Sequence, residues 1–175
     1  PITPPKIWES FNETGDVDFA YQMGQQARFR VNLMRQERGS AAVLRLIPSK
    51  VPTAEDLNLP ASVAGLYAVP RGLILVTGPT GSGKSTTLAA VLDRVNKRLS
   101  HHVITIEDPI EFVHTNDKSI FTQREIGPDV ASFAEGVKAA IREDPDCLLV
   151  GEMRDLETMR MALTAAETGL LVFAT

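Results

Sequence analysis

Apolar and polar residues alternate in the first third of the chain, from about residue 17 to residue 47. The apolar residues that share a face are Val17, Phe19 and Tyr21, and then Ala27, Phe29, Val31 and Leu33. Turns are predicted around Gly24 and at 36–39, and a third strand at 42–47. Strands of period two joined by short turns predict an antiparallel sheet. Residues 1 to about 16 give little structural signal, and we expect Trp8 and Phe11 to be the remnant of a core whose other half lies outside the chain.

Short apolar runs alternate with helical spacing in the remainder of the chain. The runs that predict buried strands are 73–76, 103–106, 147–150 and 170–174. The helix after the first run has an apolar face of Leu88, Val91, Leu92, Val95 and Leu99. A capping box from Ser132 to Glu135 and a cap at Asp155 begin two further helices, and the apolar side of the last helix is Met159, Ala162, Leu163 and Ala166. Residues 115–123 predict a loop or a short hairpin. This alternation predicts an α/β domain whose parallel sheet is covered on both faces.

Prolines at 48, 52 and 60 punctuate the segment between these two parts. Thr53 and Asp56 predict the start of a one-turn helix there. We therefore divide the chain into residues 1–47, a linker at 48–60 and an α/β domain at 61–175.

Composition narrows the class of protein. The 175 residues are 43% apolar and 23% charged, as in a soluble globular protein. The formal net charge of −4 argues against broad binding to nucleic acid. The single cysteine, Cys147, lies in an apolar run, which predicts a buried and inert thiol. No apolar run approaches the roughly 20 residues that cross a bilayer, and we expect a cytoplasmic protein.

A glycine-rich turn between the first buried run and its helix carries the clearest chemistry. Residues 78–85 match Gly-x4-Gly-Lys-Ser, and the flanking strand and helix argue against a chance match. The residues predicted to bind ATP are Gly78, Pro79, Thr80, Gly81, Ser82, Gly83, Lys84, Ser85 and Thr86. Glycines let backbone N–H groups wrap phosphate oxygens at the positive end of a helix. In this motif Lys84 reaches the β- and γ-phosphates and Ser85 holds Mg²⁺.

Acidic residues follow two of the other predicted strands. Glu107 and Asp108 follow the run 103–106, Glu111 lies one turn further on, and Glu152 follows the run 147–150. Ligands of open α/β sheets bind at the carboxyl ends of the strands. We expect the second strand to place Glu107 beside the phosphate-binding turn, where it positions or activates water. Glu152 is expected to serve the Mg²⁺ shell or to polarise water, and the sequence leaves the ranking of these two roles open. The alternative for each carboxylate is a helix cap or a surface charge.

Arginines of the antiparallel sheet are the remaining candidates. Arg30 and Arg45 are solvated strand charges unless they act on a nucleotide from a neighbouring subunit or domain. The three histidines, His101, His102 and His114, are interpreted as surface residues without a metal site.

Several motifs together resemble the type II/IV secretion ATPases, and among them the PilT-type pilus retraction ATPases are the closest fit. The motifs are Thr105-Ile-Glu-Asp-Pro-Ile-Glu-Phe-Val-His114, Thr122-Gln-Arg-Glu125, Arg142-Glu-Asp-Pro-Asp146 and Val150-Gly-Glu-Met-Arg-Asp-Leu-Glu-Thr158. The resemblance extends from about residue 16 to residue 175. It implies part of a PAS-like α+β domain with an antiparallel sheet at 1–47 and an incomplete RecA-like P-loop ATPase core at 61–175.

The resemblance also implies how the protein works. The cofactors would be ATP and Mg²⁺, and the full-length protein would be a homo-hexamer. Arg30 and Arg45 would sense ATP, and hydrolysis would move the N-terminal domain of one subunit against the core of the next. That motion would power pilus disassembly and twitching motility. The partner would be an inner-membrane pilus platform protein, with no nucleic acid, and the protein would be cytoplasmic and peripheral at the inner membrane through its partners.

Two departures from the family pattern affect the expected activity. Leu170 stands where the family usually has histidine, and the family's Leu-His-Thr motif would begin only after Thr175. We therefore expect a chain truncated at both ends, with negligible ATPase activity by itself.

Other functions stay open at this point. Within the family, a pilus extension or type II secretion ATPase shares the same motifs. A RecA-like nucleic-acid motor shares the P-loop, although aromatic residues at 6% and the acidic total argue against it. A non-hydrolysing switch is a further alternative.

Overall fold

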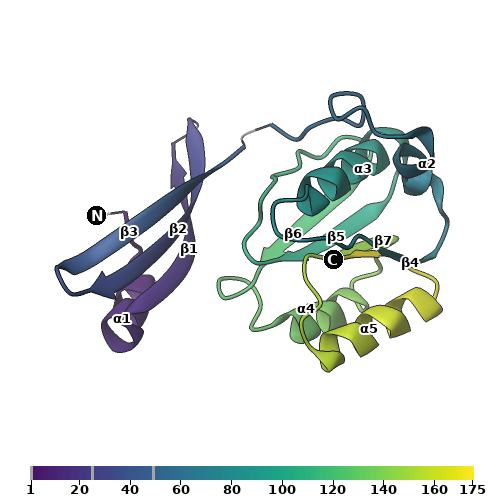
Figure 1. The fold of residues 1–175 in the computed structure, drawn as a ribbon. Helices are drawn as coiled ribbons and strands as arrows, with labels where there is room; N and C mark the ends of the chain where they lie inside the picture. Colours follow the sequence, from purple (N-terminus) through teal and green to yellow (C-terminus); the bar gives the residue numbers. More distant parts are fainter. Residues whose placement is uncertain (1, 25, 49) are drawn as a thin grey trace. The chain divides into compact units, whose positions relative to one another are not determined.

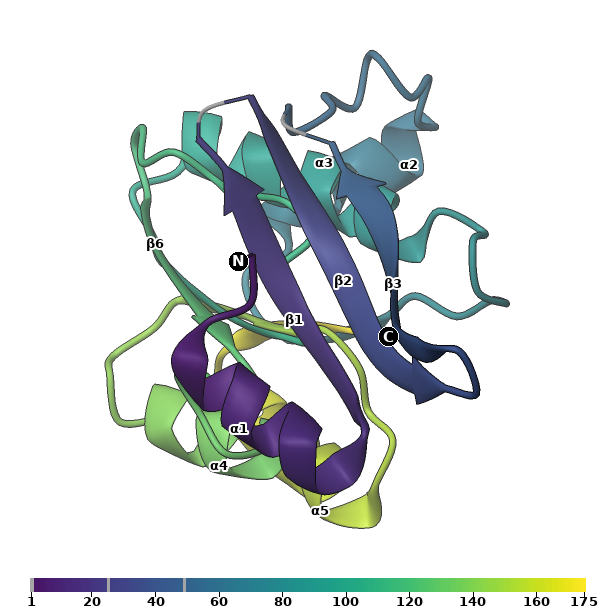
Figure 2. The same cartoon turned by 90° about the vertical axis from the view of Figure 1, so that its left-hand side faces the viewer.

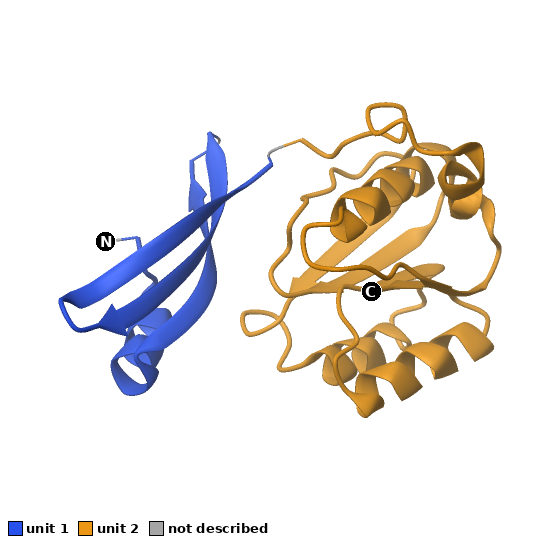
Figure 3. Cartoon of the chain, viewed as in Figure 1, with its two compact units in different colours: residues 1–49 blue, residues 50–175 orange. Residues whose placement is uncertain are grey.

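The computed structural model describes residues 2–24, 26–48 and 50–175. The chain forms two compact units, residues 1–49 and residues 50–175, which are coloured separately in Figure 3. The segment 50–60, which the sequence analysis assigned to a linker, folds with the second unit. Within it Thr53 and Asp56 exchange two hydrogen bonds of 3.0 Å, the pattern of a capping box, but residues 54–58 form a turn and not the predicted helix.

The first unit begins with a helix that the sequence pattern missed. Helix α1 (Pro5–Thr14) has a proline in its first turn and ends at Gly15, whose N–H donates to the carbonyl of Phe11. Phe11 is only 1% exposed, and it packs in a core cluster with Phe19, Val31 and Leu33. The partners of Phe11 are therefore present in this chain, contrary to the expected half-missing core. Trp8 is the more exposed neighbour of Phe11, with ring centroids 5.3 Å apart.

Three antiparallel strands complete the first unit and confirm the predicted sheet. They are β1 (Asp16–Met23), β2 (Ala27–Gln36) and β3 (Gly39–Ile47), with β2 in the middle (Figure 2). The alternation placed Phe19, Val31 and Leu33 on the apolar faces of their strands, and these residues pack with Phe11 of α1. The register places Arg30 opposite Arg45.

A five-stranded sheet forms the centre of the second unit. Its strands are β4 (Gly72–Leu75), β5 (His102–Glu107), β6 (Ile120–Glu125), β7 (Cys147–Val150) and β8 (Leu171–Ala174). They run in the order β4-β8-β7-β5-β6, and every neighbouring pair is parallel. The predicted parallel sheet is confirmed. Cys147 is fully buried on β7, and burial raises the pKa of its thiol.

Strand β6 is the element of this sheet that the sequence did not predict. The expected loop is confirmed for residues 115–119. It ends earlier than predicted and no hairpin forms, because residues 120–125 pair with β5 in parallel at the edge of the sheet. Four of its six residues are polar. Their side chains are accommodated by hydrogen bonds rather than by apolar packing, so apolar spacing could not reveal the strand.

Helices cover both faces of this sheet. On one side lies α3 (Lys84–Arg98), with the short helix α2 (Ala61–Ala64) and the 3₁₀ turn η1 (Gly65–Ala68) near it; α4 (Phe133–Ala140) and α5 (Leu156–Glu167) lie on the other (Figure 1). The side of α3 that was predicted to be apolar is buried. Ser132 caps α4 and Asp155 caps α5, as predicted.

The predicted buried side of α5 is confirmed for Ala162 and Ala166, which pack in the core, and is wrong for Met159 and Leu163. Met159 and Leu163 are 39% and 50% exposed, whereas Thr158, Ala162 and Ala165 are fully buried. Small residues let the helix lie close to the sheet, so the side with the largest apolar residues faces outward. No helix in the described parts of the chain is long and apolar enough to cross a membrane.

Candidate active site

The glycine-rich turn joins β4 to α3 at the carboxyl end of the sheet. Gly78 has φ 152°, and a Cβ on it would lie 2.7 Å from the Ser82 hydroxyl oxygen. Gly83 has φ 91° and precedes the first residue of α3. Both positions therefore require glycine, which leaves the turn with its backbone open to a ligand.

The amino end of α3 is suited to hold an anion. Gly83 offers no side-chain acceptor to the first N–H groups of the helix, and the first turn contains no acidic residue. These N–H groups carry the partial positive charge of the helix end. Lys84 adds its ammonium group, which donates to the carbonyl of Gly78 at 3.0 Å and of Pro79 at 3.4 Å. The N–H groups at the start of α3 and the Lys84 ammonium group thus lie at the same turn, and their positive charge fits the phosphates of a nucleotide.

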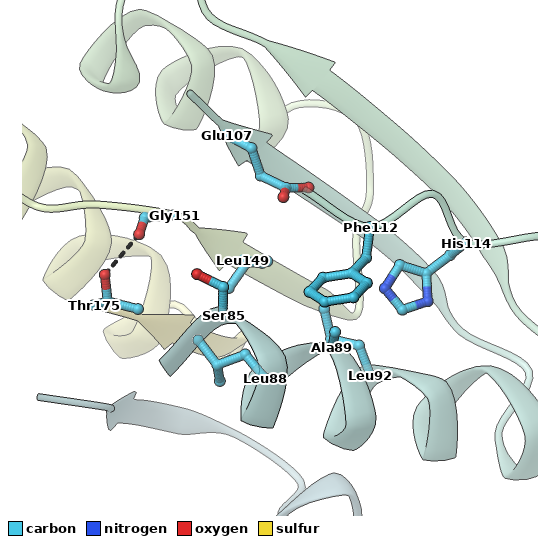
Figure 4. A pocket seen from close by; sticks show the side chains of 10 residues that line it. All are labelled: Ser85, Leu88, Ala89, Leu92, Glu107, Phe112, His114, Leu149, Gly151 and Thr175. Carbon is cyan, nitrogen blue, oxygen red and sulfur yellow. Dashed lines mark hydrogen bonds between the residues drawn. The ribbon is translucent and has the colours of Figure 1, made fainter. Parts of the chain in front are cut away.

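A small cavity connects this turn with the end of β5 (Figure 4). Its polar edge holds Ser85, the Glu107 carboxylate, Gly151 and Thr175, and its apolar wall holds Leu88, Ala89, Leu92, Phe112, His114 and Leu149. Its volume is about 30 Å³, which is enough for a water molecule. The structure therefore brings the predicted metal-binding hydroxyl and the predicted water-activating carboxylate to one cavity.

The way in which Glu107 reaches this cavity differs from the prediction. Strand β5 does not lie beside β4, the strand that leads into the glycine-rich turn, because β8 and β7 lie between them. Helix α3 instead packs across β8, β7 and β5, and its first turns carry Ser85 toward Glu107.

Glu107 is half-buried and held by hydrogen bonds. Its Oε1 accepts from the Thr105 hydroxyl at 2.7 Å and from the Gln123 amide at 3.2 Å, and its Oε2 accepts from the Glu111 N–H at 3.4 Å. Burial raises the pKa of the Glu107 carboxyl, although the Thr105 and Gln123 donors oppose the shift. A carboxylate with a raised pKa is better able to take a proton from water.

Glu152 follows β7 and lies next to the strand of Glu107. Gly151 donates its N–H to the carbonyl of Ile106 at 2.8 Å, which ties the two strand ends together. The Glu152 side chain points to a different partner, because it forms an ion pair of 2.7 Å with Arg154 and is 41% exposed. Glu152 is not among the residues that line the Ser85–Glu107 cavity.

The two candidate arginines lie together in the first unit. Arg30 on β2 and Arg45 on β3 face each other across the ladder and line one hollow with Asp18 and Asn32. The Arg30 guanidinium is 3.7 Å from the Asp18 carboxylate. The pairing gives two guanidinium groups on one surface, which is the arrangement that a polyphosphate would require.

The prediction that the histidines lie on the surface is wrong. All three are half-buried, and both ring nitrogens of His102 lie within hydrogen-bonding distance of protein oxygens. His114 lines the cavity and stacks on Phe121, with ring centroids 4.5 Å apart. Burial lowers the pKa of His114 to about 4. In the described ranges no cluster of three histidine, cysteine or acidic side chains could hold a metal ion.

His114, which lines the cavity, and Gln123, which binds the Glu107 carboxylate from β6, are the site residues that sequence reasoning missed. Gln123 belongs to a motif that was noted, Thr122-Gln-Arg-Glu125, but its contact with Glu107 depends on the parallel pairing of β6 with β5. No local pattern reveals that pairing.

Comparison with known proteins places this chain in a family. A model described as type II/IV secretion system protein matches residues 13–175. The chain is 58% identical over 174 residues to the type IV pilus retraction ATPase PilT of Pseudomonas aeruginosa, a match that covers 99% of this chain and 51% of that protein. It is 53% identical over 165 residues to a twitching motility protein of Neisseria gonorrhoeae, covering 94% of this chain and 44% of that protein.

Solved structures agree with the sequence matches. The crystal structure of the pilus retraction motor PilT with bound ADP superposes with a TM-score of 0.96 at 52% identity, covering 99% of this chain and 51% of that one. The ATPase DotB of Legionella pneumophila superposes with a TM-score of 0.88 at 35% identity, covering 99% and 50%. The chain spans about half the length of the curated relatives it matches.

The family model covers almost the whole chain, and PilT shares both its sequence and its fold. The chain therefore belongs to the type II/IV secretion system protein family, in which it is similar to the pilus retraction ATPase PilT.

Proposed function

We propose that this chain binds and hydrolyses ATP as part of a motor subunit that powers pilus retraction. The observation that carries the proposal is the cavity that joins Ser85, at the start of the P-loop helix, to the Glu107 carboxylate. A P-loop alone indicates nucleotide binding, whereas a held carboxylate at the same cavity adds a group that can act on water.

The P-loop residues supply binding in this proposal. The backbone of the turn and the amino end of α3 hold the phosphates, and Lys84 exchanges its bonds to Gly78 and Pro79 for phosphate oxygens. Ser85 and, through water, Glu152 fit the oxygen ligands that Mg²⁺ prefers. When bound, Mg²⁺ neutralises charge that develops on the β- and γ-phosphates.

Glu107 acts on the attacking water in this proposal. Its carboxylate orients a water molecule in the cavity and accepts a proton from it. The water oxygen bonds to the γ-phosphorus while the bond from the γ-phosphorus to the bridging oxygen breaks, which releases ADP and phosphate. Arg30 and Arg45 of another subunit stabilise the charge of the transition state. Hydrolysis then requires assembled subunits, and we expect the 175-residue chain to bind ATP with negligible turnover by itself.

The similarity to PilT supports the wider setting. We propose a homo-hexameric protein with a PAS-like first unit and a RecA-like second unit. It is cytoplasmic and reaches the inner membrane only through a pilus platform protein. Twitching motility is the process that it serves, in line with the name of the Neisseria gonorrhoeae relative.

The test measures ATP binding and ATP turnover separately, on the 175-residue chain and on the full-length gene product. Lys84→Ala should abolish binding of a fluorescent ATP analogue, whereas Lys97→Ala, on the same helix but outside the turn, should leave binding unchanged. Glu107→Gln should preserve binding and lower turnover of the full-length product at least 100-fold.

Three outcomes would contradict the proposal. ATP binding that survives Lys84→Ala would reject the P-loop site. A full-length product that binds ATP without turnover would be a switch. Turnover that rises with single-stranded DNA would indicate a nucleic-acid motor.

A further inference from the structure

Gln123 and Thr105 lie opposite each other on the parallel strands β6 and β5. Partners in this register point to the same face of a sheet, and both side chains donate to Oε1 of Glu107. Among the described residues, Oε2 accepts one long hydrogen bond, from the Glu111 N–H at 3.4 Å. The two oxygens of the carboxylate are therefore held differently, and Oε2 has the larger remaining capacity to accept a bond from water.

The orientation of the Gln123 amide is fixed by its other partners. Its nitrogen also donates to the carbonyl of Phe112 at 2.9 Å, and its oxygen accepts the N–H of His114 at 2.8 Å. Turning the amide over would face its oxygen toward the Phe112 carbonyl and its nitrogen toward an N–H group. Both contacts would then be lost, so the nitrogen is held toward Glu107.

One side chain thus connects three parts of the cavity. Gln123 stands on the edge strand β6 and bonds to Glu107 at the end of β5 and to the backbone of Phe112 and His114. These three partners line the cavity (Figure 4). A carboxylate that must orient water within a few tenths of an ångström needs such support from neighbouring groups. Misplacement of a catalytic group by about 1 Å lowers a rate on the order of 100-fold.

We propose that Gln123 is a positioning residue for ATP hydrolysis, which holds Oε1 of Glu107 and leaves Oε2 to act on the attacking water. The inference rests on the role proposed above for Glu107. The side-chain hydrogen bonds of Gln123 to described residues go to Glu107, Phe112 and His114, none of which is assigned to phosphate, so its contribution belongs to turnover and not to ATP affinity.

The experiment compares two substitutions of Gln123 that both remove the hydrogen-bond donor to Glu107. Gln123→Glu keeps an oxygen for the His114 N–H but removes the donor to Glu107, whereas Gln123→Met removes every polar contact without adding a charge. If the donor to Glu107 is what matters, both variants of the full-length gene product lose about 10- to 100-fold in kcat, with KM for ATP within twofold of the wild type.

Asn116→Asp is the matched control. Asn116 accepts the N–H of Phe121 through its side-chain oxygen, which aspartate retains, and Asn116 makes no bond to Glu107. Asn116 lies in the loop before β6, and Asn116→Asp adds one negative charge, as Gln123→Glu does. It should leave both kcat and KM unchanged.

A double-mutant cycle separates this inference from the proposed function. In a Glu107→Gln background, Gln123→Met should have no further effect on kcat, because the carboxylate that it positions is absent. If Glu107→Gln itself leaves turnover intact, the proposed role of Glu107 fails. If Glu107→Gln abolishes turnover while both Gln123 variants keep wild-type kcat, the positioning role of Gln123 is overturned.

A third measurement keeps the inference testable if turnover is too low to compare. Carboxyl NMR on the 175-residue chain follows the titration of Glu107, with Glu111 and His114 as the neighbouring titratable groups. Loss of a donor to the carboxylate should raise the pKa of Glu107 in Gln123→Met and leave it unchanged in Asn116→Asp. An unaltered Glu107 pKa in Gln123→Met would mean that Gln123 does not hold the carboxylate.

Discussion

Protonation of His114 should destabilise the second unit as the pH falls below 7. The imidazole is half-buried between Phe121, on which it stacks, and the apolar wall of the cavity. Burial lowers the pKa of His114 to about 4, although the charge of Asp93 opposes the shift. The folded chain therefore holds a neutral ring that the unfolded chain would protonate near pH 6.5.

The size and direction of the effect follow from these two values. A folded-state pKa below that of the unfolded chain gives a contribution that is fully present above pH 6.5 and is lost as the pH falls toward 4. At about 1.4 kcal/mol per pKa unit, the complete loss is on the order of 3 kcal/mol. Between pH 7 and pH 5 the His114 contribution should fall by about 2 kcal/mol.

Urea unfolding followed by circular dichroism, at pH 7 and pH 5, measures this effect. His114→Phe keeps a flat ring for stacking on Phe121 but cannot be protonated. The wild type should lose about 2 kcal/mol more than His114→Phe between the two pH values. NMR of the ring in the folded chain gives the His114 pKa directly.

The first unit supplies an internal control. It contains Trp8, the only tryptophan, and all three histidines lie in the second unit. Unfolding followed by Trp8 fluorescence should therefore be the same in wild type and His114→Phe at either pH. A His114 ring that titrates near 6.5 in the folded chain, or equal pH dependence of the two proteins, would refute the reasoning.

Three further substitutions test the fold and the site. Glu107→Gln should stabilise the chain more at pH 8 than at pH 4. Burial raises the pKa of the Glu107 carboxyl, so the fold disfavours the ionised form, which is populated at the higher pH. Equal urea midpoints for the wild type and Glu107→Gln at pH 8 would contradict this. Phe11→Ala should lower the unfolding free energy of the first unit by about 3–5 kcal/mol, read by Trp8 fluorescence, and an unchanged transition would mean that α1 does not support the sheet. Gly136→Ala would place a Cβ 2.8 Å from the Ile106 Cγ2, so it should destabilise the second unit by about 1–3 kcal/mol although alanine favours a helix by about 1 kcal/mol; a higher melting temperature would show that the packing yields.

The sequence determined the parts of this protein that depend on neighbours along the chain. The P-loop could be identified because its glycines, Lys84 and Ser85 act within one turn between a strand and a helix. Period-two alternation gave the antiparallel sheet, and capping residues such as Ser132 gave helix starts. Each of these features is a local interaction, and its signature lies within a few residues.

The tertiary structure decided the features that depend on distant residues. Helix α1 is held by Phe11 through packing on the sheet, and a ten-residue helix is marginal without such packing. The outward position of Met159 shows that close approach of small residues, rather than apolar content alone, selected the buried side of α5. Strand β6 is polar and acquires its place by pairing with β5.

The same distinction applies to the site. Sequence predicted that Glu107 follows a strand, but the order β4-β8-β7-β5-β6 and the path of α3 determine that Glu107 meets Ser85 at one cavity. Gln123 reaches Glu107 only through the pairing of the edge strand β6 with β5, and its side chain also binds the N–H of His114, which lines the cavity. Short segments of the sequence identify the functional groups. The distances between these groups depend on strand order and packing, which no short segment specifies.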